Sequence, residues 1–140
     1  MEKKFEFIDI TAADVAFVAY GNDLNELFAN AALAMFNVMV ETKNVERKVE
    51  RRISVSGDDL VSLLFNWLNE LLFYVDAENL VFSEFNVSVD TERFTLTAAC
   101  RGEQISAKHE VKTHVKAATM HRMKIEKKQG RWEATVILDI

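Results

Sequence analysis

The sequence predicts an α+β fold in which two amphipathic helices pack against a largely antiparallel β-sheet as a layered sandwich. Two long segments, residues 24–39 and 60–73, place apolar side chains at helical spacing. Several shorter segments alternate apolar and polar residues, as half-exposed strands do. The chain has no proline and only four glycines, and each glycine is predicted to mark a turn where the hydrophobic period changes. The glycines are Gly21, Gly57, Gly102 and Gly130.

The N-terminal part is predicted to contain two strands, a helix and a further strand. Residues 5–8 and 14–20 have the composition of strands separated by a turn. Asp23 and Glu26 have the spacing of a helix capping box, and a helix is predicted to follow. Residues 47–55 alternate charged and apolar side chains, as a half-exposed strand would. The apolar face of the helix consists of Leu24, Leu27, Phe28, Ala31, Leu33, Met35, Phe36 and Met39.

A second helix is predicted to start at Gly57 and Asp58. Asp58 is the expected N-cap, and Asp59 lies beside the positive end of the helix dipole. With three further apolar residues added to its main stripe, this helix is apolar nearly all round, which predicts a central position with sheet on more than one side. The stripe is Leu60, Leu63, Leu64, Trp67, Leu68, Leu71 and Leu72, and the additions are Val61, Phe65 and Phe73.

The remaining chain is predicted to form four strands. Residues 81–90 and 93–101 form an expected hairpin, and residues 116–127 and 131–138 form two more strands joined by a turn at 128–130. Gly102 is followed by a polar stretch. Because no low-complexity linker or internal repeat interrupts these elements, the chain is predicted to be a single domain.

Composition limits the classes of function. The 140 residues, 1–140, fit one domain with a normal globular balance, and disorder is expected only within Met1 to Lys4. The net charge of −5, from 17 basic and 22 acidic side chains, disfavours unspecific binding to a phosphate backbone. A local basic patch would still be able to contact RNA. An acidic chain is also suited to docking on a basic partner, such as an enzyme that holds nucleic acid.

Cysteine and hydropathy favour the cytoplasm. The single cysteine, Cys100, excludes an intrachain disulfide and a cysteine-rich zinc site, and it is expected to be a buried strand residue. The charged N-terminal residues lack the apolar run of a signal peptide. No apolar stretch is judged to reach the ~18 residues that a membrane span requires, so no membrane partner is expected.

Signatures of catalysis are absent. The chain lacks GxGxxG, P-loop, GxSxG and HExxH motifs. His109, His114 and His121 are close in sequence, but His114 and His121 are seven residues apart and would face opposite sides of a strand. A histidine metal site is therefore disfavoured. The histidines are predicted to be surface or half-buried residues that bond to the backbone.

Two carboxylates at strand ends are the most informative charged groups. Asp14 begins an apolar strand, Asp139 ends another, and the main-chain carboxylate of Ile140 adds a negative group beside Asp139. Such anions repel one another unless a cation lies between them, and hard divalent cations take oxygen ligands. On the residues alone, the simpler interpretation is preferred: Asp14 is a turn residue and Asp139 a solvated terminal charge. Lys116, entering an apolar strand, either extends to water or holds a phosphate or a partner carboxylate.

Several segments together resemble the archease family. Residues 20–28 and 31–36 are similar to its first helix, residues 57–72 to its second, residues 115–121 to its VKAxTYH stretch, and residues 138–140 to its closing tripeptide. The resemblance spans nearly the whole chain in order and spacing. It therefore adds an expected function to the fold predicted from the pattern.

The resemblance implies an accessory role. Archeases are not thought to be catalysts; they activate the RtcB-type RNA ligase of tRNA splicing and RNA repair by promoting its guanylylation and multiple turnover. The resemblance implies metal-binding carboxylates at Asp14, Asp139 and the Ile140 terminus, and a functional lysine at Lys116. The implied cofactor is a divalent cation, Ca²⁺ first, with Mg²⁺ or Mn²⁺ as alternatives. The implied partner is the ligase, with tRNA contacted only indirectly and no small-molecule substrate.

The sequence departs from the family pattern at two places. Thr11 and Ala12 occupy the positions where the family usually has His-Thr, so the metal is expected to bind more weakly or with more water. Met120 stands where tyrosine is common, which is interpreted as a packing change. Two other functions stay open. One is a stand-alone metal-dependent hydrolase, which needs a deep pocket and a general base. The other is a chaperone-like module, which needs a large exposed apolar patch.

Overall fold

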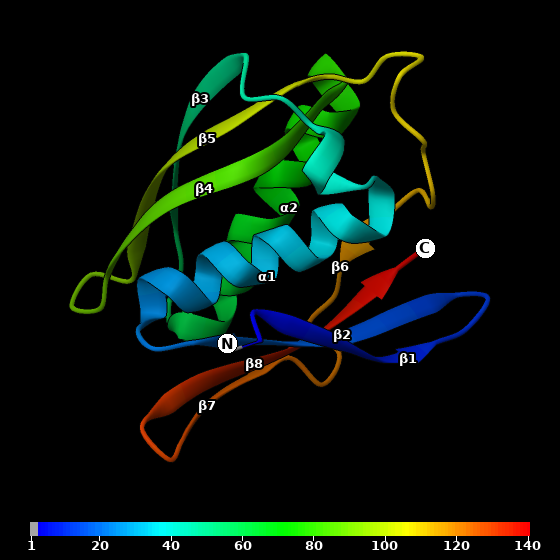
Figure 1. Ribbon diagram of the computed structural model, residues 1–140. Coiled ribbons are helices and arrows are strands. Elements are labelled where there is room, and N and C mark those ends of the chain that lie inside the picture. The colour runs from blue at the N-terminus through cyan, green and yellow to red at the C-terminus, as the bar shows by residue number, and fades with distance from the viewer. Residues whose placement is uncertain (1–2) are drawn as a thin grey trace.

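Two antiparallel sheets enclose two helices in the computed structural model of the chain, as Figure 1 shows. The structure describes residues 3–140, so the disorder expected for Met1 and Glu2 lies outside the described residues. The helices are α1 (Leu24–Met39) and α2 (Leu60–Glu78), and the short 3-10 helix η1 (Thr42–Asn44) follows α1. The predicted α+β class and layered sandwich are confirmed, with the helices forming the middle layer.

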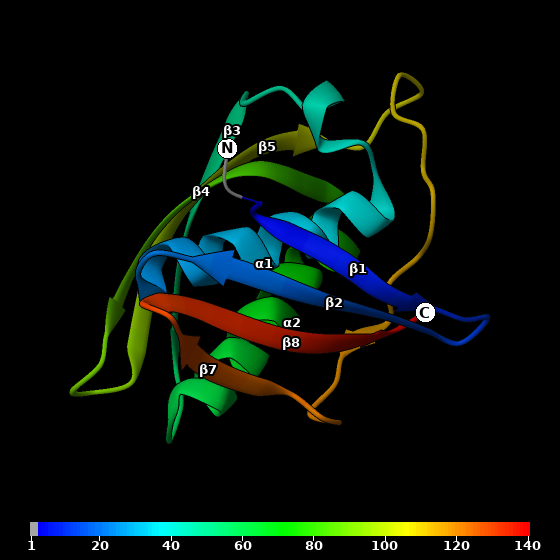
Figure 2. The same ribbon diagram turned by 60° about the horizontal axis from the view of Figure 1, so that its bottom comes forward.

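The first sheet carries the end of the chain. Its main path has the order β1-β2-β8-β6, and β7 also pairs with β8, as can be followed in Figure 2. All of these pairings are antiparallel. Strand β8 therefore lies in the interior of the sheet, with β2 on one side and two shorter strands on the other. The strands are β1 (Phe5–Ile10), β2 (Asp14–Gly21), β6 (Ala117–Ala118), β7 (Lys124–Lys128) and β8 (Arg131–Asp139).

The second sheet has three strands in the order β3-β5-β4. They are β3 (Val49–Ser56), β4 (Leu80–Asp90) and β5 (Thr95–Gln104). The expected hairpin of β4 and β5 is confirmed. Gly102 lies inside β5 and not at a turn as predicted. Glycine is needed there because a Cβ atom would overlap the Val81 carbonyl oxygen of β4. Cys100 is buried in β5 as predicted, and burial raises the pKa of its thiol to about 12.

Both helices begin at side-chain caps. Asp23 caps α1 as predicted, because its carboxylate accepts a hydrogen bond from the Glu26 backbone N–H at 2.8 Å. The cap of α2 is Asp59 rather than the expected Asp58. Ser62 stands three residues after Asp59, and its N–H donates to the Asp59 carboxylate at 2.7 Å while its hydroxyl accepts from the Asp59 N–H at 3.1 Å. This reciprocal pairing selects Asp59.

Helix α2 packs between the sheets, contacting strands of both, so sheet on more than one side is confirmed. Its fully buried Trp67 donates an indole N–H hydrogen bond to the Phe28 carbonyl of α1 at 3.0 Å, which satisfies a polar group inside the core. Phe73, in contrast, is 57% exposed, so the helix is not buried all round. By length and composition alone, its 19 residues are apolar enough to cross a membrane, which corrects the expectation that no stretch qualifies.

The predicted strand 116–127 is wrong, because a turn divides it into β6 and β7. The Met123 N–H donates to the Met120 carbonyl at 3.1 Å, and Arg122 has a φ of 54°, which ends the extended backbone. His121 lies in this turn and His114 precedes β6. The argument that His114 and His121 face opposite sides of one strand is therefore also wrong.

A buried carboxylate holds the long connection between β5 and β6. Glu103 is 5% exposed and accepts hydrogen bonds from the Glu46 backbone N–H at 2.7 Å and from Lys108 at 3.0 Å. Its Oε2 also lies 3.0 Å from Nε2 of His109, which is buried. Because Nδ1 of His109 accepts the Ser106 N–H at 2.9 Å, the neutral ring donates its Nε2–H to Glu103. These bonds fix the segment that leads to β6.

We expect Glu103→Gln to lower the free energy of unfolding by about 1–3 kcal/mol, because the neutral amide loses the charge that strengthens the bonds from Glu46, Lys108 and His109 to Oε2. Burial alone raises the pKa of Glu103, but the hydrogen bonds from the Glu46 backbone, Lys108 and His109 outweigh it and lower the pKa to about 2. A lowered pKa gives stability that is present above the unfolded value and lost as pH falls through the folded value.

The difference between the wild type and Glu103→Gln should therefore narrow as pH falls from 4.5 toward about 2. Urea denaturation followed by circular dichroism across this range checks it. Glu92→Gln, at an exposed turn, is the control and should leave stability unchanged. A gap between wild type and Glu103→Gln that stays constant with pH would contradict this account of Glu103.

Candidate functional site

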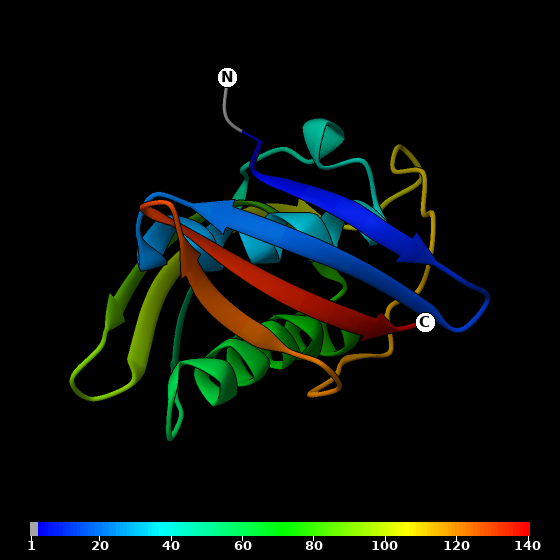
Figure 3. The ribbon, with the colours of Figure 1, turned by 90° about the horizontal axis from the view of Figure 1, so that it is seen from below.

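The two carboxylates singled out by the sequence lie opposite each other at one end of the first sheet. The register of β2 and β8 pairs Asp14 with Asp139. Figure 3 shows the C-terminus beside the turn that joins β1 to β2. Two positions separated by most of the chain are therefore brought together by a single pair of strands.

The hydrogen bonds define how this pair is oriented. The Ile140 N–H donates to the Ala13 carbonyl at 2.9 Å, so the next residues along the ladder form a hydrogen-bonded pair. Asp14 and Asp139 consequently form a non-hydrogen-bonded pair, in which the Cα atoms are about 4.5 Å apart and the side chains share one face. Val15 and Leu138 beside them are buried against the helices. The two aspartates therefore point to the outer face of the sheet.

Neither carboxylate has a partner within residues 3–140. Asp14 is exposed, Asp139 is half-buried, and neither side chain forms a hydrogen bond or an ion pair with a described residue. Like charges directly opposite each other on a sheet repel, and a cation between them would remove the repulsion. Two adjacent carboxylates without a counter-charge therefore fit a hard divalent cation.

The rest of such a coordination shell would have to come from other oxygens. In the part of the chain that the structure describes, no group of three His, Cys, Asp or Glu side chains is arranged to hold a metal ion. A cation at Asp14 and Asp139 would therefore take its remaining ligands from water or from main-chain oxygens such as those of Ile140. This donor set is open on the solvent side.

Lys116 lies at the same end of the sheet, on the other side of β8. Its backbone N–H donates to the Asp139 carbonyl at 2.8 Å, and the next residue, Ala117, is opposite Asp139 in the register. The Lys116 side chain is exposed and has no ion pair with a residue of the described chain. Asp14, Asp139, Ile140 and Lys116, the four predicted site residues, are thus all at one end.

Thr11 has a role that sequence reasoning missed. Its hydroxyl accepts the backbone N–H of Asp14 at 3.0 Å and that of Ala13 at 3.2 Å, while its own N–H donates to the Asp14 carbonyl at 2.8 Å. Serine and threonine commonly close turns in this way. Thr11 therefore fixes the backbone that presents Asp14, although it cannot replace an imidazole as a ligand.

A groove of about 630 Å³ runs along the outer face beside the carboxylate pair. Ala16 and Ile137, which face each other one outward-facing row from the aspartates, form its floor. Arg122 and Lys124 line one wall, and sequence reasoning did not select either residue. Exposed apolar side chains also lie around this end; they include Ile8, Ile10 and Met120.

Comparison with known proteins finds consistent relatives. The model of the archease protein family matches residues 5–140. The chain is 49% identical over 140 residues to the archease of Methanothermobacter thermautotrophicus, covering 99% of each chain. It is 45% identical over 139 residues to the archease of Sulfurisphaera tokodaii, again covering 99% of each.

Two solved structures have the same fold. The solution structure of a Methanobacterium thermoautotrophicum protein is 49% identical, with a TM-score of 0.86 over 98% of this chain and 99% of that one. A crystal structure from Thermotoga maritima, described as an archease and possible chaperone, has a TM-score of 0.65 at 20% identity over 100% of this chain and 98% of that one. At that identity the second likeness shows the fold alone.

Repulsion between the facing carboxylates is expected to lower the free energy of unfolding of the protein. In the presence of EDTA and at low salt, Asp139→Asn should raise the free energy of unfolding by about 0.2–1 kcal/mol, because it removes a like-charge pair. Thermal or urea denaturation measures the change. The matched control is Glu92→Gln at the exposed β4–β5 turn, which should have no effect. A loss of stability in Asp139→Asn would mean that the carboxylate has a stabilising partner.

Proposed function

This chain belongs to the archease family, and from that membership we propose that it is a non-catalytic accessory protein that activates an RtcB-type RNA ligase. It promotes guanylylation and multiple turnover of a ligase that works in tRNA splicing and RNA repair in the cytoplasm, and it meets tRNA only through that ligase. The observation that carries the proposal is the cross-strand pair of Asp14 and Asp139.

The proposed working end comprises Asp14, Asp139 and the main-chain carboxylate of Ile140. Together they hold one divalent cation, Ca²⁺ first and Mg²⁺ or Mn²⁺ as alternatives. The bound cation supplies positive charge that orients phosphates and neutralises developing negative charge. The protein supplies the geometry: the Thr11 turn fixes Asp14, and the strand ladder fixes Asp139.

Accessibility supports this use of the carboxylate pair. The aspartates face away from the helices, at an end of the sheet where no other described element covers Asp14. A partner with a recessed active site would therefore be able to receive this end of the molecule. Lys116, beside Asp139, would contact a phosphate or an acidic group of that partner.

The two rival functions have less support. A stand-alone hydrolase needs an enclosed pocket with a general base, whereas Asp14 and Asp139 face outward from the sheet and do not line the groove beside them. The Thermotoga maritima relative is described as a possible chaperone. A chaperone-like module needs a large contiguous apolar patch, but the exposed large apolar residues of the described chain are divided among β1, α2, the β5–β6 connection and the turn after β6.

Asp139→Asn should lower multiple-turnover RNA joining by the ligase by at least about tenfold, since losing even an outer-shell partner of a metal costs roughly that much. The assay contains the ligase, GTP, the activator and RNA ends with a 3′-phosphate and a 5′-hydroxyl. Ca²⁺ binding, followed by calorimetry on the activator alone, should weaken in parallel. Asp76→Asn is the control for net charge. Unchanged turnover with Asp139→Asn would overturn the proposal.

Lys116→Ala should separate partner contact from metal binding. We expect it to reduce stimulation of the ligase by about tenfold, the effect of losing one charged interaction of about 1.4 kcal/mol. Ca²⁺ binding to the activator alone should stay within error, because Lys116 is not a ligand. Lys128→Ala, at the β7–β8 turn, is the control. If Lys116→Ala stimulates the ligase as fully as the wild type does, Lys116 does not contact the partner as proposed.

A further inference from the structure

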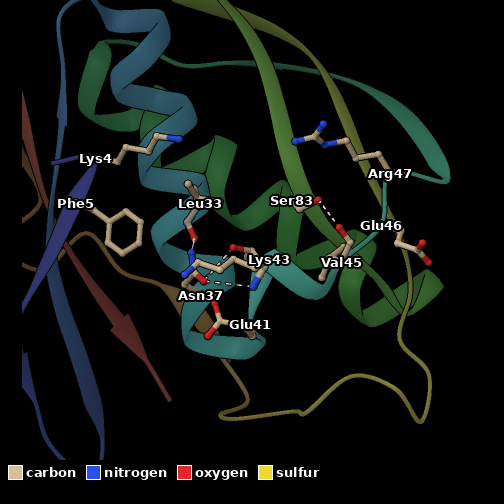
Figure 4. Close-up of a pocket in the computed structure, with 11 residues that line it drawn as sticks. Lys4, Phe5, Leu33, Asn37, Glu41, Lys43, Val45, Glu46, Arg47 and Ser83 are labelled. Carbon is tan, nitrogen blue, oxygen red and sulfur yellow. Dashed lines mark hydrogen bonds between the residues drawn. The ribbon is translucent and has the colours of Figure 1, made fainter. Parts of the chain in front are cut away.

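A larger cleft of about 790 Å³ lies at the opposite end of β1 from the carboxylate pair. Figure 4 shows Lys4 and Phe5, at the start of β1, on one side of α1 and Arg47 and Ser83 on the other. The floor is the outward side of α1, including Leu33. The cleft therefore lies between the edge strands of the two sheets, at β1 and β4.

The cationic side chains of the cleft lack close partners. Lys4 and Lys43 form no side-chain hydrogen bond or ion pair with any residue in 3–140, and both are exposed. Arg47 approaches only Glu84, at 3.7 Å. Lys4 and Lys43 therefore give this concave surface positive charge without a counter-charge among residues 3–140, and Arg47 adds a guanidinium that it shares with Glu84.

The acidic residues of the same cleft are already neutralised from outside it. Glu41 pairs with Lys112 at 3.4 Å. Glu46 pairs with Lys48 at 3.2 Å and with Lys108. None of these three lysines lines the cleft. The surface that a ligand would meet is therefore positive.

The remaining lining is apolar or internally satisfied. The Asn37 amide N–H donates to the Leu33 carbonyl at 3.0 Å, and its oxygen accepts the Thr42 hydroxyl at 3.0 Å. The Ser83 hydroxyl donates to the Val45 carbonyl at 3.0 Å. Phe5 is half-buried, and its ring points toward α1 in Figure 4. Recognition here would therefore rest on positive charge and on the aromatic ring, with few free hydrogen-bonding groups.

We propose that this cleft binds a nucleotide, with its phosphates along the row of cations formed by Lys4, Lys43 and Arg47 and its base against Phe5. Cations beside an aromatic ring are the usual means of holding a phosphate and stacking a base. The volume lies within the range of about 300–1,000 Å³ for small-molecule sites. An acidic peptide would use the cations but would leave the ring without a stacking partner. The nucleotide is either free or one residue of single-stranded RNA.

Fluorescence anisotropy with labelled GTP and with a labelled short oligouridylate tests the proposal. The measurement contains EDTA and no ligase, so its failure is distinguishable from failure of the proposed activation. Lys43→Glu and Arg47→Glu should each weaken binding by about tenfold or more. For the oligonucleotide, each should also make the salt dependence shallower by about 0.7 for every phosphate that the variant no longer binds. Arg93→Glu, which makes the corresponding charge change at the exposed β4–β5 turn, at the other end of β4 from Ser83, should bind as wild type.

Competition identifies the source of the nucleotide. If GTP displaces the labelled GTP far better than inorganic phosphate does, and Phe5→Leu removes that advantage, the cleft binds the free nucleotide. If only the oligonucleotide binds, and Phe5→Leu weakens it, the source is single-stranded RNA. Absence of binding by both probes up to millimolar concentration overturns the proposal. Binding that Lys43→Glu and Arg47→Glu leave unchanged overturns it as well.

Discussion

The antiparallel pairing of β2 with β8 is the constraint on which the candidate site depends. Its register sets Asp14 against Asp139, and its alternation directs Val15 and Leu138 to the helices while both aspartates face out. A slip of β8 by one residue would turn Asp139 toward the apolar helices and expose its core side chains Ala134, Val136 and Leu138. Because burying an unpaired carboxylate is costly, the hydrophobic core enforces the register. The packing of the interior thus determines the arrangement of charges at the surface.

The same arrangement places two like charges opposite each other, which destabilises this end of the sheet. Two uncompensated anions on adjacent strands cannot strengthen the sheet, so its cohesion must come from elsewhere. The buried interior supplies this cohesion. Trp67 donates a hydrogen bond to the Phe28 carbonyl, and the Phe36 and Phe82 rings pack edge to face with their centroids 5.8 Å apart. The Glu103 and His109 pair supplies a second, polar anchor for the connection that leads to β6. A repulsive pair at the end of an otherwise cohesive sheet is typical of a group retained for function.

The sequence predicted the elements better than their ends. Strong periodicity and the Asp23 cap located α1, but Asp58 and Asp59 are both plausible caps until the return bond from Ser62 is considered. The turn that splits residues 116–127 was missed because Arg122 adopts a positive φ without a glycine to signal it. The buried position of His109 was missed because its partner, Glu103, lies on the preceding strand. In the candidate site, the residues alone did not predict a joint role for Asp14 and Asp139, whereas the family resemblance did. That the two residues are close together could be established only from the register of β2 and β8.

Strand β8 comes last among the described strands, yet it occupies the interior of its sheet. During synthesis on the ribosome, the second sheet and both helices are complete in the emerging chain before residues 131–139 exist. Until then β2 is paired only with β1, and β6 and β7 have no strand to pair with. Nascent chains that have not released their last strand therefore have no assembled carboxylate pair, because Asp14 then has no residue opposite it on β8.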